Sequence, residues 1–169
     1  MDKKILVTYA TRYGATAEIA QRLGETLQLE GLAVEVLPVK EAGVPEQYAA
    51  VVLGSAVYIG GWRKEAAQYL QENEAALAKL PVWIFSSGPT GEGDPVELLK
   101  GWRIPEALKP AAERIQPRDI AVFGGALDEE KMNVLEKFVI KRVIAPTGDF
   151  RDWGAVEAWG KSIAAALKG

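Results

Sequence analysis

The sequence predicts an α/β protein of one domain, residues 1–169, in which helices cover both faces of one doubly wound sheet of five parallel strands. Continuous apolar runs predict the strands, because such runs are typical of strands that are buried on both faces. The five runs are Lys4–Tyr9, Ala33–Pro38, Ala50–Gly54, Val82–Ser86 and Ile120–Phe123. Segments with helical periodicity fill the gaps, and this alternation is typical of parallel βαβ units with right-handed crossovers.

The helices are predicted from apolar residues that recur every three or four positions. In the first helix, Thr16–Glu30, one stripe holds Ile19, Leu23 and Leu27. Gly31 is expected to end this helix as a C-terminal glycine. The same spacing predicts helices over Lys64–Leu77, Asp128–Ile144 and Trp153–Leu167.

Residues 89–119 form the least regular stretch, with one short helix expected around Glu106–Ile115. It is rich in proline, namely Pro89, Pro95, Pro105, Pro110 and Pro117. Because a predicted strand follows it, this stretch is interpreted as an excursion from the fold and not as a linker between domains.

Composition excludes several classes of function. The chain has 169 residues, of which 49% are hydrophobic and 25% charged, as expected for a soluble globular protein with a core. A net charge of −3, from 20 basic and 23 acidic residues, argues against a nucleic-acid partner such as duplex DNA. With 0 His and 0 Cys, disulfides, Cys-ligated iron–sulfur clusters, Cys/His zinc sites and Ser-His-Asp triads are impossible. Redox chemistry would therefore need a bound organic cofactor.

The N-terminal region does not have the pattern of a targeting segment. Its apolar run, Ile5–Ala10, is too short for the core of a signal peptide. No apolar stretch approaches the roughly 18 residues that a transmembrane helix needs. The expected location is cytoplasmic.

The turn after the first strand has the composition of a phosphate-binding loop. It reads Thr11-Arg12-Tyr13-Gly14-Ala15-Thr16, and the first helix is expected to begin at or near Thr16. The helix N-terminus offers unpaired N–H groups, the two threonines can donate hydrogen bonds, and Gly14 lets the backbone approach a ligand. The alternative is that Thr11 or Thr16 only caps the helix. The turn lacks the patterns of a triphosphate loop and of a dinucleotide site.

A first strand that ends in Thr-x-x-Gly-x-Thr resembles the flavodoxin family, whose members hold the phosphate of FMN in this turn. Two further loops resemble those that flank the isoalloxazine ring in that family. The resemblance covers nearly the whole chain and implies the strand order 2-1-3-4-5, with three loops around one crevice. The residues implied in FMN binding are Thr11, Arg12, Tyr13, Gly14, Ala15 and Thr16, then Ser55, Ala56, Val57, Tyr58, Ile59 and Gly60, then Ser87, Gly88, Pro89, Thr90 and Gly91.

Two aromatic residues compete for contact with the flavin ring. Tyr58 stands where flavodoxins offer a stacking side chain, and Trp62 is the alternative. The alternative is that one of the two simply packs under a helix. No aromatic residue lies between Ser86 and Lys100, so the second ring face is expected to be open or apolar, unless Trp102 reaches back to cover it.

The C-terminal part resembles more narrowly the menaquinone-dependent protoporphyrinogen dehydrogenases. The resemblance rests on Phe123-Gly124-Gly125-Ala126-Leu127, Phe138-Val139-Ile140-Lys141 and Asp152-Trp153. It implies an extra helix after strand five, residues 128–144. This helix has an acidic start and a basic later part, as the helix dipole favours. Alternatively, it lies on a membrane surface and gives access to a lipid quinone.

Three functions remain open at this point. The preferred one is an FMN-binding redox protein that transfers electrons through a non-covalently bound flavin, with a redox partner protein or a quinone as its partner. The alternative is an FMN-dependent, quinone-linked protoporphyrinogen dehydrogenase. The third, a flavin-free domain that has kept only the fold, is disfavoured by the threonines of the first loop. No catalytic proton-transfer residue and no metal site is predicted, and the oligomeric state stays open.

Overall fold

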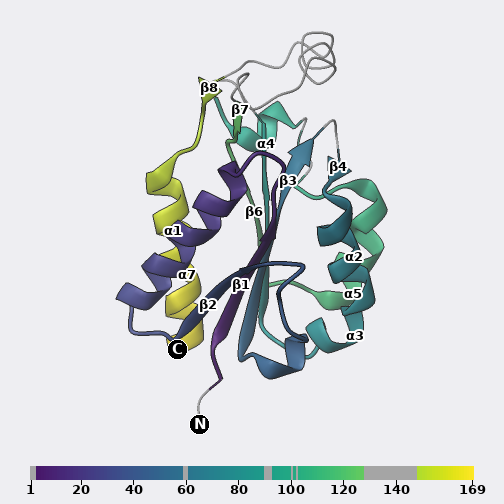
Figure 1. Ribbon diagram of the computed structural model, residues 1–169, viewed down its shortest axis with the longest axis vertical. Helices are drawn as coiled ribbons and strands as arrows, with labels where there is room; N and C mark the ends of the chain where they lie inside the picture. The colour runs from purple at the N-terminus through teal and green to yellow at the C-terminus, as the bar shows by residue number, and fades with distance from the viewer. Residues whose placement is uncertain (1–2, 59–60, 90–92, 100, 102, 128–147) are drawn as a thin grey trace.

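The computed structural model describes residues 3–58, 61–89, 93–99, 101, 103–127 and 148–169. Within these residues the main sheet has parallel strands in the order β2-β1-β3-β5-β6 (Figure 1). The strands are β1 (Ile5–Ala10), β2 (Val34–Pro38), β3 (Ala50–Tyr58), β5 (Val82–Ser87) and β6 (Asp119–Phe123). The predicted order 2-1-3-4-5 is confirmed, because β4 (Gly61–Trp62) is a short strand outside this path.

Strand β3 runs four residues beyond its predicted end at Gly54. Its last residues have partners on both sides. Val57 and Tyr58 pair antiparallel with β4, and Ala56 pairs in parallel with Ser87 of β5. This short hairpin carries the second predicted loop to the upper end of the sheet in Figure 1.

Two layers of helices cover the sheet (Figure 1). On one face lie α1 (Ala15–Leu29) and α7 (Trp153–Lys168). The other face is covered by α2 (Lys64–Glu72), α3 (Glu74–Leu77) and α5 (Lys109–Ile115). As predicted, α1 stops before Gly31, which has a φ of +90°.

The prediction of one helix over Lys64–Leu77 is wrong at Asn73, which separates α2 from α3. The Asn73 side chain donates from Nδ2 to the carbonyl oxygen of Tyr69 at 2.9 Å. An asparagine amide that bonds nearby backbone competes with regular helix, and Asn73 takes φ −110° and ψ 17°. The helical periodicity of the apolar residues continues through Asn73, so the periodicity alone does not reveal the break.

The irregular stretch holds α4 (Pro95–Leu98), a 3₁₀ turn η2 (Glu106–Leu108) and α5. A further 3₁₀ turn, η1 (Pro45–Gln47), precedes β3. Beyond β6, β7 (Ala126–Leu127) and β8 (Gly148–Asp149) form a separate antiparallel pair. Strands this short fall below what hydrophobic periodicity can detect. The predicted helix over 128–144 lies outside the described residues.

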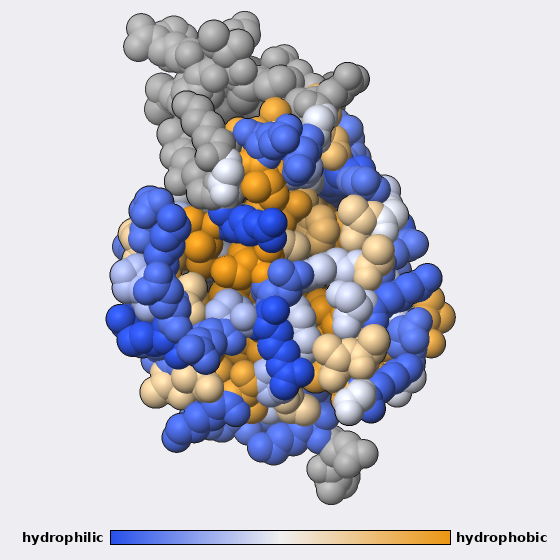
Figure 2. Space-filling view, turned by 180° about the vertical axis from the view of Figure 1, so that it is seen from behind, coloured by the Kyte–Doolittle hydropathy of each residue, from blue (hydrophilic) through white to orange (hydrophobic). Residues whose placement is uncertain are grey.

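The core consists of one apolar cluster on each face of the sheet. On the α1/α7 face, Phe85, Phe123 and Trp159 form an aromatic group with ring centroids 5.5–6.1 Å apart. Figure 2 shows the molecule from behind, with apolar surface that borders the grey residues and is framed by hydrophilic side chains. None of the helices in the described ranges is both long and apolar enough to cross a membrane.

Candidate functional site

The predicted loops meet at a cavity at the carboxyl ends of the strands. Its walls come from the first loop (Thr11, Arg12, Tyr13, Ala15, Thr16), the second (Ala56, Val57), the third (Ser87, Gly88) and the segment after β6 (Gly125, Ala126). Parallel strands bring these loops together because their carboxyl ends share one edge of the sheet. None of the described residues that line the cavity is acidic.

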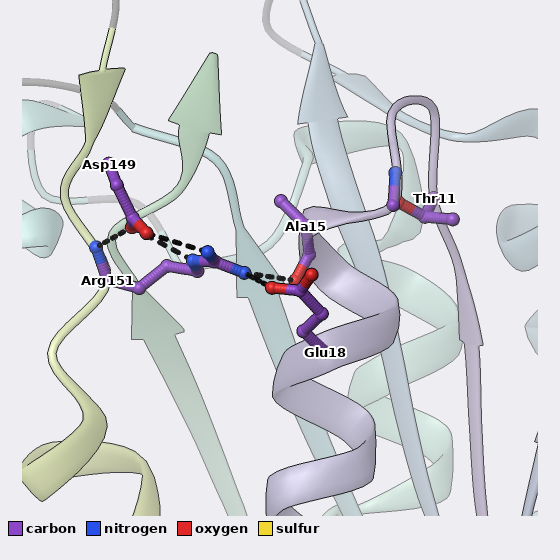
Figure 3. A network of polar contacts seen from close by, with 6 residues as sticks. Thr11, Ala15, Glu18, Asp149 and Arg151 are labelled. Carbon is purple, nitrogen blue, oxygen red and sulfur yellow. Dashed lines mark hydrogen bonds and ion pairs between the residues drawn. The ribbon is translucent and has the colours of Figure 1, made fainter. Parts of the chain in front are cut away.

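The first loop is a tight turn closed by its own threonine. Thr11 Oγ1 accepts a hydrogen bond from the backbone N–H of Gly14 at 2.9 Å (Figure 3). Gly14 precedes α1 with a φ of 94°, a left-handed conformation that favours glycine. Thr11 therefore shapes the turn, and its own hydroxyl proton is not used in that bond.

Thr16 does not cap α1, since it is the second residue of the helix and not the residue before it. The capping position belongs to Gly14, which has no side chain to accept a hydrogen bond from the first turn. Thr16 is only 1% exposed and lines the cavity. The start of α1 thus combines uncapped backbone N–H groups with a hydroxyl side chain beside a hollow.

Arg12 and Tyr13 contact each other within this turn. Arg12 Nε donates to the Tyr13 hydroxyl at 3.0 Å, and its guanidinium carbon lies 5.4 Å from the centre of the Tyr13 ring. Both residues line the cavity.

In the second loop, Ala56 and Val57 line the cavity, whereas Ser55 does not. The buried Ser55 hydroxyl accepts from the backbone N–H of Arg63 at 2.9 Å and donates to the Ala56 carbonyl oxygen at 2.9 Å. Its role in this structure is to fix the start of α2 against β3. Ile59, Gly60 and the side chain of Tyr58 lie outside the part of the chain that is described.

Trp62, the competing aromatic residue, is held below the loop. Its Nε1–H donates to Ser86 Oγ at 2.8 Å, and this hydroxyl donates to the Arg103 carbonyl oxygen at 2.9 Å. The Trp62 ring packs against the core cluster of the α2 face. Trp62 is therefore a packed residue of that face and is absent from the described cavity lining.

In the third loop, Ser87 and Gly88 line the cavity. Gly88 touches the second loop so closely that a Cβ there would lie 2.6 Å from the Val57 carbonyl oxygen. Pro89 does not line the cavity, and its carbonyl oxygen accepts from the Gly125 N–H at 2.9 Å. Thr90, Gly91 and Trp102 lie outside the described residues.

Gly125 and Ala126 were not predicted as site residues, although they belong to the segment that carries the narrower resemblance. A Cβ at Gly125 would lie 2.6 Å from the Gly88 Cα, and one at Gly124 would lie 2.2 Å from the Phe150 carbonyl oxygen. The signal in the sequence is the Gly-Gly pair directly after a strand, which is typical of a close backbone approach. The segment that this pair begins forms a fourth wall of the cavity.

Sequence reasoning also missed Arg151, which lies next to the first turn of α1 (Figure 3). Its guanidinium bonds Asp149 through Nε at 2.9 Å and Nη2 at 2.7 Å, and it also pairs with Glu18. The hydrogen bonds with Asp149 raise the pKa of Arg151 and lower that of Asp149. Nothing in the sequence places Arg151 beside α1, because 133 positions separate it from Glu18.

The groups that line this cavity suit an anionic organic ligand and not a metal ion. Within the described ranges, no group of three or more Asp or Glu residues is placed to hold a metal. The fold and the cavity together define a doubly wound α/β protein whose ligand site lies at the carboxyl edge of its sheet. Residues 6–153 match the Flavodoxin domain family, and the chain belongs to that family.

Known proteins agree with this assignment. The chain is 25% identical over 182 residues to protoporphyrinogen IX dehydrogenase [quinone] of Escherichia coli (strain K12), covering 95% of this chain and 94% of the relative. A flavodoxin from the domain Archaea superposes with a TM-score of 0.67 at 12% identity, over 98% of this chain and 99% of that chain. Flavodoxin 2 from Bacillus cereus superposes with a TM-score of 0.58 at 20% identity, over the same shares. The two superpositions show the shared fold.

Proposed function

We propose that this protein binds FMN non-covalently and transfers electrons through it. One observation carries the proposal: Thr16 at the start of α1, Val57 near the end of β3 and Ser87 at the end of β5 line one cavity. In doubly wound sheets, ligands bind in the crevice outside the carboxyl ends of the strands. Membership of the Flavodoxin domain family supports the same ligand.

The start of α1 fits the phosphate of FMN. Gly14 offers no side-chain cap, so the first N–H groups of the helix can bind an anion. Thr11 and Thr16 would donate hydroxyl hydrogen bonds, and Arg12 adds positive charge at the rim. Charge-assisted hydrogen bonds of this kind are about twice as strong as neutral ones.

The other walls fit a flat ring. Ala56 and Val57 offer apolar contact, and backbone groups of Ser87 and Gly88 would bond the polar edge of the flavin. Tyr58 is proposed as the stacking residue, because Trp62 is bonded to Ser86 below the loop. When bound, FMN supplies the electron transfer, and the chain binds it, orients it and limits the access of water.

The absorption spectrum of the purified protein tests this proposal. A yellow protein that releases FMN on heating, or a colourless one that takes up added FMN, supports it. A colourless protein that binds no added FMN contradicts it.

A second function is favoured by the Escherichia coli relative, which spans nearly the whole chain. It is the oxidation of a porphyrinogen with a quinone as the electron acceptor, in place of electron transfer to a partner protein. An assay of porphyrinogen oxidation with a menaquinone analogue separates the two. Turnover identifies the enzyme, and bound flavin without turnover favours the carrier. A cytoplasmic location belongs to both versions of the proposal, and the proposed membrane contact of the 128–144 helix lies outside the described residues.

A further inference from the structure

Arg151 lies between β8 and α7, and its side chain is only 11% exposed. Its guanidinium is held by three partners (Figure 3). It donates two hydrogen bonds to the Asp149 carboxylate, pairs with Glu18, and donates from Nη1 to the Ala15 carbonyl oxygen at 3.4 Å. The guanidinium carbon of Arg151 also lies over the face of the Trp153 ring, 4.8 Å from the ring centroid. So many partners fix both the position and the orientation of this charge.

These contacts connect two walls of the cavity. Ala15 lines the cavity at the start of α1. Asp149 pairs with Ala126 across the β7–β8 sheet, and Ala126 lines the cavity on the other side. Arg151 therefore links the turn beside α1 to the wall that follows β6.

Arg151 also compensates a charge that would oppose an anionic ligand. Glu18 is the acidic residue in the first turn of α1. A carboxylate there competes with a bound phosphate for the positive end of the helix dipole and repels it through space. Pairing with Arg151 holds the Glu18 carboxylate and offsets its charge.

We propose that Arg151 is a positioning residue for the phosphate of the ligand: it anchors the start of α1 to β8 and offsets the charge of Glu18. This inference rests on the proposed binding of FMN. Riboflavin has the same ring without the phosphate, so the ratio of the riboflavin Kd to the FMN Kd isolates the effect on the phosphate.

Glu18→Gln is the first variant, measured by flavin fluorescence at low ionic strength. It removes an exposed carboxylate while Asp149 still holds Arg151, so we expect the Kd ratio to rise about two- to fivefold. Glu25→Gln is the matched control, since Glu25 lies on the same helix and is 63% exposed against 62% for Glu18. It lies about 10 Å farther along α1 and should leave the ratio unchanged.

Arg151→Met tests the other partner. The ratio should fall about two- to fivefold because the Glu18 and Asp149 carboxylates are then uncompensated. The double variant with Glu18→Gln restores the wild-type net charge of this group and should return the ratio close to the wild-type value. An unchanged ratio in Arg151→Met, or an equal rise in Glu18→Gln and Glu25→Gln, overturns the inference. Wild-type protein that binds no flavin overturns the proposed function instead, so the two failures are distinguishable.

Discussion

At the scale of single residues, Thr16 is the side chain on which phosphate binding most depends. Thr16→Ala should weaken FMN binding about tenfold while riboflavin binding barely changes, because a hydroxyl bond to a charged group is worth about 1.5 kcal/mol or more. Titration with both flavins measures this.

Thr26→Ala is the matched control for that variant. Thr26 lies on the same helix, is also buried, and bonds the Arg22 carbonyl oxygen at 2.8 Å, away from the cavity lining. Its FMN affinity should stay at the wild-type value. Equal losses of FMN and riboflavin in Thr16→Ala would contradict a phosphate role.

Tyr69 gives a prediction for the dependence of stability on pH. Burial, with Tyr48 and Glu46 nearby, raises its pKa from 10.0 to about 12. A raised pKa means that the folded state favours the neutral phenol, so this contribution to stability is complete below pH 10 and is lost as the pH rises through about 12. Urea unfolding should show a steeper decline over this range for wild type than for Tyr69→Phe. Equal declines in the free energy of unfolding for the two proteins would contradict this role of Tyr69.

The sequence allows some of these residues to be predicted and not others. Thr11, Gly14 and Thr16 are predictable because a turn that leads directly into a helix fixes their surroundings locally. The role of Ser55 is not, because the N–H that engages it belongs to Arg63, across the β3–β4 hairpin. The position of Arg151 beside α1 likewise cannot be predicted without the fold.

At the scale of elements, close backbone contacts join the third loop to the segment after β6. Gly125→Ala places a Cβ against the Gly88 backbone, so it should lower the free energy of unfolding by about 1–3 kcal/mol. Gly61→Ala is the control, because its Cβ would meet nothing within 4 Å. It should change stability by less than about 0.5 kcal/mol. Equal effects of the two substitutions in urea unfolding would contradict the close packing.

Strands and helices differ in how far the sequence defines them. The five long strands are predictable because burial on both faces leaves continuous apolar runs. The extension of β3 and the β7–β8 pair are not, because both depend on partners that only the fold supplies. The break at Asn73 depends on one side-chain bond within a continuous apolar stripe.

At the scale of the whole molecule, the parallel sheet explains why distant segments share one site. The loops after β1, β3 and β5 meet because these strands are parallel, so their carboxyl ends lie at the same edge of the sheet. Helices cover both faces of this sheet (Figure 1). Such an arrangement specifies where a ligand binds but not which chemistry follows.

A crystal structure of the protein, from crystals grown with excess FMN, would locate the phosphate of the ligand relative to α1. We expect this phosphate at the start of α1, within hydrogen-bonding distance of backbone N–H groups of the 11–16 turn and of the Thr16 hydroxyl. A phosphate bound elsewhere, or a cavity filled by the protein's own side chains, would show that the 11–16 turn does not bind FMN as proposed.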